Sequence, residues 1–241
     1  MRYTIVIAIV LACGCCDVHA QGLKGFFEKF ISGKPASLTN DEVIAGLKEA
    51  LTIGVKDVSE MTSVVDGFYK NPKVFIPWPE EALKMKDILV KTGFSKQVSA
   101  FEESMNRAAE EAAKGAYDVF AGVVKGMTIQ DGFAILNGGD TAATHYLREK
   151  THVSLKEKFS PVVQKAIDKI QVTSYWTPLV TTYNKIPGVT KQNPDLEDYV
   201  TNRAINGLMT LIAEQEIKIR KDPAAQVTSL LKKVFGNNSS K

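Results

Sequence analysis

Cysteine is scarce in this sequence and is confined to one place. The three cysteines all lie between residues 13 and 16 of the 241-residue chain. That stretch has the layout of a secretory signal peptide, because Arg2 precedes an apolar run that ends before Val18-His19-Ala20. We expect cleavage after Ala20, so that residues 1–20 are a leader. The mature chain then has no thiol for a disulfide, a covalent nucleophile or a metal site.

The same leader permits a second route of export. Val10-Leu11-Ala12-Cys13 resembles a lipobox, in which Cys13 becomes the lipidated first residue of an anchored protein. The apolar run is about 14 residues long, against the roughly 20 that a membrane-spanning helix needs. We therefore predict an exported, periplasmic or envelope-associated protein, with a lipoprotein anchored through Cys13 as the alternative.

Histidine is also scarce, and the common catalytic motifs are missing. His145 and His152 remain after the leader, without the His-Glu-x-x-His spacing of zinc sites or the Glu-x-x-His pairs of di-iron bundles. The sequence has no Gly-x-Ser-x-Gly elbow for a serine nucleophile. We expect no catalytic residue of these classes, no metal and no cofactor.

Charge of one sign does not accumulate anywhere in the chain. The 30 Lys and Arg residues are interspersed with the 27 Asp and Glu residues, and the formal net charge is +3. A nucleic-acid-binding protein would normally concentrate Lys and Arg on one stripe, so we expect no nucleic-acid partner.

Apolar residues recur at helical spacing in nearly every segment, and the alternation typical of strands is absent. The pattern predicts an all-α fold. We expect a single multi-helix, bundle-like domain of about nine to eleven helices over residues 38–236. An N-terminal amphipathic arm over residues 21–37 would precede this domain, and a disordered tail over residues 237–241 would follow it.

Local signals predict several helix boundaries. Capping boxes at Thr39-Asn40-Asp41-Glu42 and Thr128-Ile129-Gln130-Asp131 each begin a helix. An unbroken apolar stripe predicts one continuous helix over residues 98–123. Pro161 predicts a break or kink in a helix that starts near residue 154. Residues 204–213 are apolar on almost every side, which is typical of a buried central helix.

The segment over residues 66–79 is rich in proline and in aromatic residues. Its prolines forbid a continuous helix, so we expect an ordered loop. Phe68, Tyr69, Phe75 and Trp78 either line a groove for a ligand or pin the loop to the core. We favour the second interpretation, because such a loop would otherwise expose a large apolar patch.

Five polar residues are candidates for a ligand-binding site. Three of them, Asn106, Arg107 and Glu110, share one helical face at steps of three and four residues. The alternative is a solvent-exposed helical face on which Glu103 pairs with Arg107 and Glu110 pairs with Lys114. A functional version requires another element to cover this face and desolvate its charges.

The other two candidates, Asp140 and Thr144, belong to the segment Gly138-Gly139-Asp140-Thr141-Ala142-Ala143-Thr144. A helix N-terminus after the two glycines could offer backbone donors to a small anion. A tight turn in which the glycines supply positive φ is the simpler interpretation, because the segment lacks the Lys of a P-loop.

Short motifs occur in one order along the chain. They are Asp66-Gly67-Phe68, Asn71-Pro72, Ile76-Pro77-Trp78-Pro79, Asn106-Arg107-Ala108-Ala109-Glu110, Gly138 to Thr144, Phe159-Ser160-Pro161, Tyr199-Val200-Thr201 and residues 218–236. With them the sequence resembles, over residues 38–236, the domain-of-unknown-function family numbered 4197, which is found in exported bacterial proteins. The resemblance implies an exported helical domain and supplies no catalytic residue. It includes the same five polar positions.

The expected function is binding of a protein partner or a small-molecule ligand in the cell envelope. One alternative is a metal-independent enzyme that uses Glu110 or Asp140 near Arg107. This alternative predicts a cleft in which the three groups converge. A second alternative is a peripheral membrane or lipid-anchored protein, held by the arm over residues 21–37 or by lipid on Cys13.

Overall fold

The computed structural model describes residues 39–169, 176–177, 180–181, 184–185, 187–188, 191, 195–226, 232 and 234. Residues Leu38–Lys241 form one compact unit. Its described part contains seven α-helices, two short 3-10 helices and no strand. The all-α prediction is therefore confirmed, whereas a count of nine to eleven helices is not. The predicted leader, arm and tail lie outside the described residues.

The described helices differ in length, from the three residues of each 3-10 helix to the 28 of α7. In chain order they are α2 (Asn40–Thr62), η1 (Glu80–Ala82), α3 (Leu83–Lys91), α4 (Ser95–Ala113), α5 (Ala116–Gly126), α6 (Ile129–Leu136), α7 (Ala142–Lys169), α9 (Leu196–Lys221) and η2 (Pro223–Ala225). Among the described residues, no single helix combines the length and the apolar composition of a membrane span. Helices α5 and α6 have that composition when taken together, but the two are bent by 105°.

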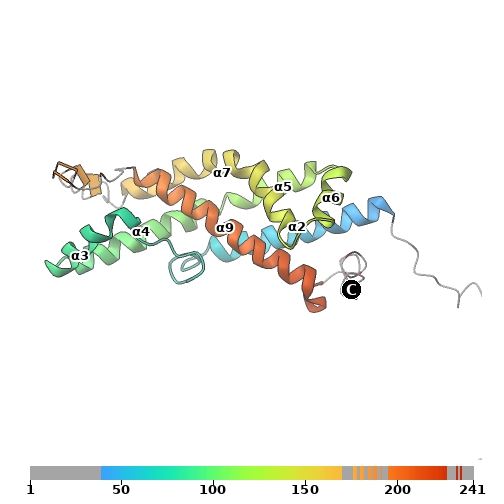
Figure 1. Cartoon of the computed structure of the whole chain (residues 1–241), viewed down its shortest axis with the longest axis horizontal. Helices are drawn as coiled ribbons and strands as arrows, with labels where there is room; N and C mark the ends of the chain where they lie inside the picture. The colour runs from blue at the N-terminus through green and yellow to red at the C-terminus, as the bar shows by residue number, and fades with distance from the viewer. Residues whose placement is uncertain are drawn as a thin grey trace, which may run out of the picture. The chain divides into compact units, whose positions relative to one another are not determined.

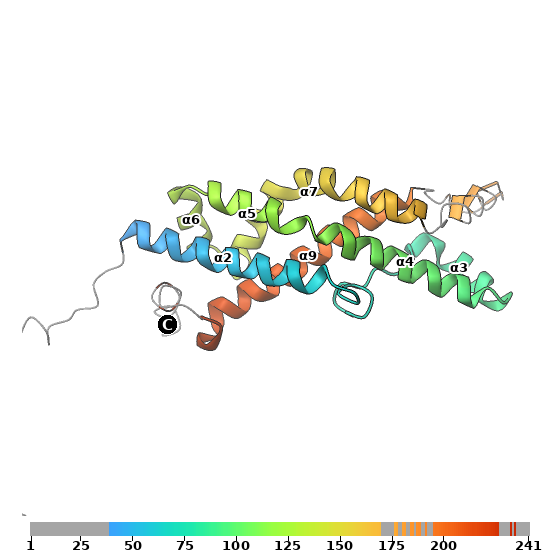
Figure 2. The same ribbon diagram turned by 180° about the vertical axis from the view of Figure 1, so that it is seen from behind.

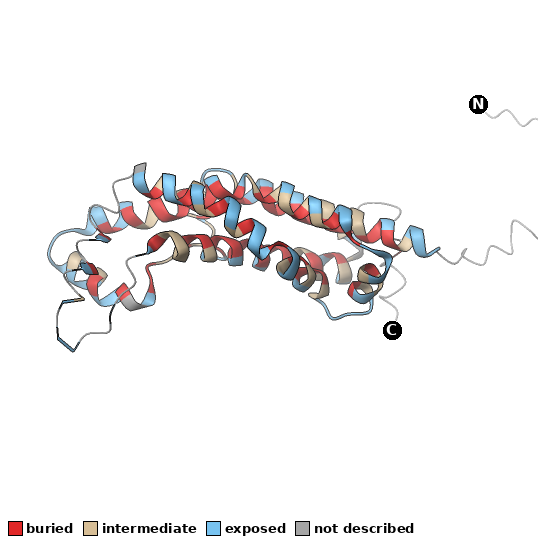
Figure 3. Cartoon of the chain, turned by 90° about the horizontal axis from the view of Figure 1, so that it is seen from above, coloured by how far each residue is buried: buried red, intermediate tan, exposed pale blue. Residues whose placement is uncertain are grey.

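Helix α9 is the central element of this unit. It crosses the other long helices obliquely and packs against α7, α2 and α4 (Figures 1 and 2). Ala204, Ile205 and Leu208 have no exposed surface. Figure 3 shows that the buried residues lie along the facing sides of the helices. The prediction of a buried central helix over residues 204–213 is confirmed.

Both predicted capping boxes are present. The Thr39 hydroxyl accepts from the Glu42 amide, and the Glu42 carboxylate accepts from the Thr39 amide. Thr128 and Asp131 repeat this reciprocal arrangement at the start of α6. Each box satisfies two backbone donors that the first helical turn leaves without a partner. The starts of α2 and α6 could therefore be predicted from four residues each.

The single helix predicted over residues 98–123 is wrong, because α4 ends at Ala113 and α5 begins at Ala116. The amides of Lys114 and Gly115 donate to the carbonyls three residues earlier, at 3.3 and 3.1 Å. This is the tighter hydrogen bonding of a 3-10 turn. Glycine is a poor helix former, and it stands at the break. The apolar stripe continues across the break, so periodicity alone did not reveal it.

For Pro161 the sequence predicted a break or a kink in a helix that starts near residue 154; the break and that start are wrong. Helix α7 runs without interruption from Ala142 to Lys169, with Pro161 inside it. Pro161 has no N–H and leaves the helical ladder one hydrogen bond short. Phe159 and Val163, on either side of it, have no exposed surface. Tertiary burial on both sides therefore holds the helix together where local propensity would end it.

Candidate functional site

Asn106, Arg107 and Glu110, which we call the α4 clamp, hold the loop of residues 63–79 against α4. Asn106 is fully buried and binds both backbone polar groups of Ile76. Its Oδ1 accepts from the Ile76 N–H at 2.8 Å, and its Nδ2 donates to the Ile76 carbonyl at 3.0 Å. Nδ2 also donates to the Glu102 carbonyl at 2.8 Å. The oxygen and the nitrogen of the Asn106 side chain therefore both have hydrogen-bond partners within the chain.

Glu110 caps the start of the same loop. Its side chain is only 6% exposed. Oε1 accepts from the amides of Phe68 and Tyr69, each at 3.1 Å, and Oε2 accepts from Arg107 Nη1 at 2.8 Å. The expected Glu110–Lys114 pair is wrong, because Lys114 pairs with Glu111 instead. The loop therefore covers this helical face, which is not the solvated surface of the simpler interpretation.

Arg107 links the clamp to the loop by charge. Its Nη2 donates to Asp66 Oδ1 at 2.8 Å and to Glu103 Oε1 at 3.0 Å, so the expected pair with Glu103 is confirmed. The guanidinium also lies 5.2 Å from the centre of the Tyr69 ring. The hydrogen bond with Glu110 is the largest of several contacts that raise the pKa of Arg107 above its ordinary value.

The loop itself is built for close packing. Asp66 is the only non-glycine residue with positive φ, at 71°, among those that the structure describes. A Cβ on Gly67 would lie 2.5 Å from the carbonyl oxygen of Met61. On the α9 side, a Cβ on Gly207 would lie 3.1 Å from both Phe68 and Val74. The prediction of an ordered loop pinned to the core is confirmed.

Asp66 should make the stability of this loop depend on pH. The pKa of Asp66 is lowered, first by its hydrogen bond with Lys70 and then by that with Arg107. A carboxyl with a lowered folded-state pKa stabilises the fold above its unfolded-state pKa, and this contribution is lost as the pH falls through the folded-state pKa. We expect Asp66→Asn to be less stable than the natural protein at neutral pH, and the difference to disappear as the pH falls from about 3.9 through the lowered folded-state pKa of Asp66.

Asparagine suits this comparison because it tolerates positive φ almost as well as aspartate does. Urea unfolding followed from neutral to strongly acidic pH provides the measurement. A stability difference that stays constant over the whole range would contradict a role for the Asp66 charge.

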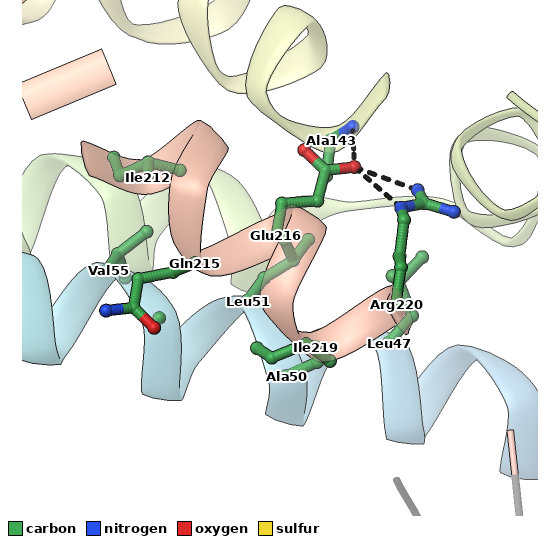
Figure 4. A pocket seen from close by; sticks show the side chains of 11 residues that line it. Leu47, Ala50, Leu51, Val55, Ala143, Ile212, Gln215, Glu216, Ile219 and Arg220 are labelled. Atoms are coloured by element: carbon green, nitrogen blue, oxygen red, sulfur yellow. Dashed lines mark hydrogen bonds and ion pairs between the residues drawn. The ribbon is translucent and has the colours of Figure 1, made fainter. Parts of the chain in front are cut away.

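The donors at the N-terminus of α7 bind a carboxylate of the same chain. Glu216 on α9 accepts from the Ala143 amide at 2.9 Å, and from the amide and the hydroxyl of Thr144 at 2.8 Å each. Arg220, one turn along α9, donates to the same carboxylate at 2.8 and 3.0 Å. Figure 4 shows Glu216 pointing toward both Ala143 and Arg220. The anion that binds at this helix N-terminus is therefore the carboxylate of Glu216, which belongs to the protein itself.

Asp140 lies apart from that arrangement. It pairs with Lys221 on the surface, where both side chains are more than half exposed. The turn before α7 is tight, as expected, but neither Gly138 nor Gly139 has positive φ. A Cβ on Gly138 would instead lie 2.5 Å from the Ala142 Cβ, so this glycine permits a close approach of the chain.

The five predicted residues thus separate into three places. Asn106, Arg107 and Glu110 lie together, Thr144 belongs with Glu216, and Asp140 pairs on the surface. The convergence of Glu110 and Asp140 near Arg107, which the enzyme hypothesis requires, does not occur. Within the described ranges no three His, Cys, Asp or Glu side chains gather as a metal site would need.

A cleft of about 440 Å³ lies elsewhere, along the N-terminal half of α9. One wall is a polar stripe on α9, formed at steps of three or four residues by Asp195, Asp198, Asn202 and Asn206. Pro79, Trp176 and Lys191 line it from other segments. The volume falls within the range of small-molecule sites. The i, i+3 and i+4 spacing of these polar residues was the sequence signal for this wall.

The charges in the cleft are only partly balanced. Asp198 pairs with Lys156 at 2.6 Å, and this hydrogen bond is the main cause that lowers the Asp198 pKa. Arg203 lies 5.5 Å from the centre of the Tyr199 ring, and the Tyr199 hydroxyl donates to the Pro77 carbonyl at 3.0 Å. Among the residues that the structure describes, neither Arg203 nor Lys191 has a carboxylate at ion-pair distance.

An aromatic cluster lies beside this cleft. Trp176, which lines it, is stacked on Phe101 at 5.4 Å between ring centres and meets Trp78 edge-on at 5.8 Å. The indole N–H groups of both tryptophans are buried, and neither has a hydrogen-bond acceptor among the described residues. These are the only two tryptophans in the sequence, so tryptophan fluorescence can report on binding in the cleft.

Comparison with known proteins gives a family but no activity. Neither the curated proteins nor the solved structures gave a match. One family model, described as protein of unknown function (DUF4197), matches residues 37–236, in agreement with the resemblance predicted from the short motifs. The match spans most of the 241 residues, and the chain therefore belongs to this family.

Proposed function

We propose that this protein is exported to the cell envelope and binds a small polar molecule in the α9 cleft. The observation that carries the proposal is the cleft itself, with a volume of about 440 Å³ and two cations, Lys191 and Arg203, that pair with no carboxylate of the described residues. Sites for small molecules are usually concave, with an apolar lining and a few well-placed polar groups. Here Trp176 and Pro79 supply the apolar surface.

The α4 clamp is a weaker candidate for the binding site. The carboxylate of Glu110 and the amide of Asn106 are buried, and both already bind backbone groups of the loop. A ligand would have to displace those bonds and leave the backbone groups unpaired. The cleft demands less, because Asn202, Asn206 and Arg203 line it and their known contacts are to side chains, not to buried backbone groups.

Native mass spectrometry of the protein isolated from its own envelope fraction tests the proposal. We expect the mass of the chain cleaved after Ala20, plus a ligand that is lost on unfolding. A bare mature chain that also fails to take up ligand from a cell extract would contradict the proposal and favour a protein partner. Added mass that persists on unfolding and fits a lipidated Cys13 would identify the lipoprotein alternative.

A variant that fills the cleft should separate binding there from binding elsewhere. Asn202→Phe places a bulky side chain on the polar wall of the cleft, and we expect it to remove the ligand without lowering the thermal midpoint. Thr210→Phe is the matched control, because Thr210 is exposed on the same helix and does not line the cleft. Equal retention of ligand by the two variants would place the binding site outside the cleft.

A further inference from the structure

We propose that the ligand of the α9 cleft carries a phosphate group, held between Arg203 and Arg148 beside Asn206. This inference rests on the binding function proposed above and names the chemistry of the ligand. It comes from two arginines on different helices, neither of which forms an ion pair with an acidic side chain in the part of the chain that the structure describes.

Arg148, on α7, does not line the cleft itself but binds a residue that does. Its Nη1 donates to Asn206 Oδ1 at 2.7 Å, and Asn206 lines the cleft. The partner is an uncharged amide, so the bond orients the guanidinium without cancelling its charge. In the described part of the chain, Arg148 has no carboxylate at ion-pair distance.

Arg203, on α9, lines the cleft. It precedes Asn206 by three residues, a spacing that puts two side chains next to each other on a helix. The guanidinium lies over the ring of Tyr199, whose hydroxyl is fixed by the Pro77 carbonyl. Arg203 is therefore oriented by uncharged groups, as Arg148 is. Two pre-oriented guanidinium groups therefore lie along this cleft, that of Arg148 at Asn206 and that of Arg203 at Tyr199.

A phosphate group fits this arrangement better than a single carboxylate does. Guanidinium groups bind phosphate through two parallel hydrogen bonds, and a phosphate monoester carries about −1.5 to −2 charges at neutral pH. One such group can satisfy two arginines. A carboxylate carries a single charge and leaves one of the two guanidinium groups without compensation.

The acidic residues of the cleft give the ligand a direction. Asp195 and Asp198 lie at the start of α9, about three and two turns from Asn206, respectively, at 3.6 residues per turn. Asp198 is engaged by Lys156, and Asp195 accepts from the Asp198 amide at 3.2 Å. We therefore place the phosphate at the Asn206 end and hydroxyl or amino groups of the ligand at the Asp195 end.

Tryptophan fluorescence of the mature protein tests this inference, because Trp176 lines the cleft and Trp78 contacts Trp176. The probes are phenyl phosphate, benzoate and benzyl alcohol, which share an aromatic ring and differ in charge. We expect saturable binding of phenyl phosphate, weakened about tenfold to hundredfold in Arg148→Gln and in Arg203→Gln. Arg203→Lys should also weaken the binding of phenyl phosphate, since lysine keeps the positive charge but cannot donate two parallel hydrogen bonds as a guanidinium group does.

Lys96→Gln is the matched control. Lys96 is an exposed cation on α4 with no ion pair among the described residues, and its loss should leave the affinity for phenyl phosphate unchanged. Thermal midpoints equal to that of the natural protein would show that the arginine variants are folded.

The outcomes separate this inference from the proposed function. If benzyl alcohol binds as tightly as phenyl phosphate, or if Arg148→Gln/Arg203→Gln binds phenyl phosphate as the natural protein does, the phosphate site is excluded while the cleft remains a binding site. If no probe binds and no ligand is isolated with the protein, both proposals fail.

A soluble phosphate ester and a lipid head group share this chemistry, and vesicles distinguish the two sources. Sedimentation with phosphatidylcholine vesicles that contain phosphatidic acid, lost in Arg148→Gln/Arg203→Gln, would identify a lipid head group. Binding of phenyl phosphate without sedimentation would identify a soluble ester.

Discussion

Replacing Glu216 with alanine should lower the free energy of unfolding by about 3–5 kcal/mol. Glu216 is buried, and its two carboxylate oxygens accept from Ala143, Thr144 and Arg220. The substitution removes the negative charge and leaves Arg220, with a side chain only 14% exposed, as an uncompensated charge in the protein interior. It also leaves two backbone amides at the first turn of α7 without an acceptor, at a place where the helix dipole favours a negative charge.

Part of the interaction should survive in Glu216→Gln. The amide oxygen can still accept from the α7 amides, but its NH2 group faces donors and the charge that balances Arg220 is gone. We expect a loss smaller than that of the alanine variant but still well above that of a surface substitution. Arg220 keeps one bond in either variant, since its Nη2 also donates to the Ile135 carbonyl at 2.9 Å.

Glu214→Ala is the matched control, because Glu214 lies two residues away on the same helix. It pairs with Lys73 at 2.6 Å, but both side chains are about half exposed. A surface pair of this kind contributes at most about 1 kcal/mol. Urea unfolding monitored by circular dichroism measures both variants. A loss in Glu216→Ala no greater than that in Glu214→Ala would show that the buried network contributes nothing beyond a surface pair.

The sequence predicted the fold well where the signal was local. Four-residue capping boxes gave the starts of α2 and α6, and the apolar run over residues 204–213 gave the central helix. It failed where tertiary packing overrides local propensity. Pro161 remains within α7 because its neighbours are buried on both sides, and Gly115 interrupts a stripe whose apolar pattern does not change.

The site was predicted less well, because partners distant in sequence define it. The spacing of Asn106, Arg107 and Glu110 correctly placed them on one face, but it could not reveal that the loop covers that face. Asp66, 41 residues before Arg107, was not among the candidates. Glu216 was missed too, although its four-residue step to Arg220 within an apolar helix was a readable signal for a buried pair.

The cleft shows the same limitation. Asn206 lies within the apolar run over residues 204–213, and Tyr199 belongs to the Tyr199-Val200-Thr201 motif. The contact that matters for Asn206 comes from Arg148, 58 residues earlier on another helix. Periodicity places residues on a face of one helix. It does not tell which side chain of a second helix arrives there.

Asn106→Ala should release the loop of residues 63–79 and lower the free energy of unfolding by about 2–4 kcal/mol. The substitution removes three buried hydrogen bonds and leaves the N–H and the carbonyl of Ile76 without partners. Water cannot replace the lost amide unless the loop opens, because Ile76 is almost fully buried. Gln97→Ala, an exposed amide on the same helix, should change stability by no more than about 0.5 kcal/mol.

Limited trypsin digestion under native conditions measures the release of the loop, since Lys70 and Lys73 lie within it. We expect Asn106→Ala to be cleaved there much faster than the natural protein and Gln97→Ala to be cleaved at the natural rate. Unchanged cleavage at both lysines would mean that the loop is held without the α4 clamp.

The release should reach the cleft as well, through a series of adjoining contacts. Asn106 fixes Ile76, the next residue offers its carbonyl to the Tyr199 hydroxyl, and Arg203 lies over the Tyr199 ring. A loop that opens in Asn106→Ala loses the acceptor that orients Tyr199, and Arg203 then loses its fixed position. We therefore expect the affinity for phenyl phosphate to fall in this variant, although Asn106 does not line the cleft. Full affinity in a variant whose loop is cleaved rapidly would show that Arg203 is positioned without the loop.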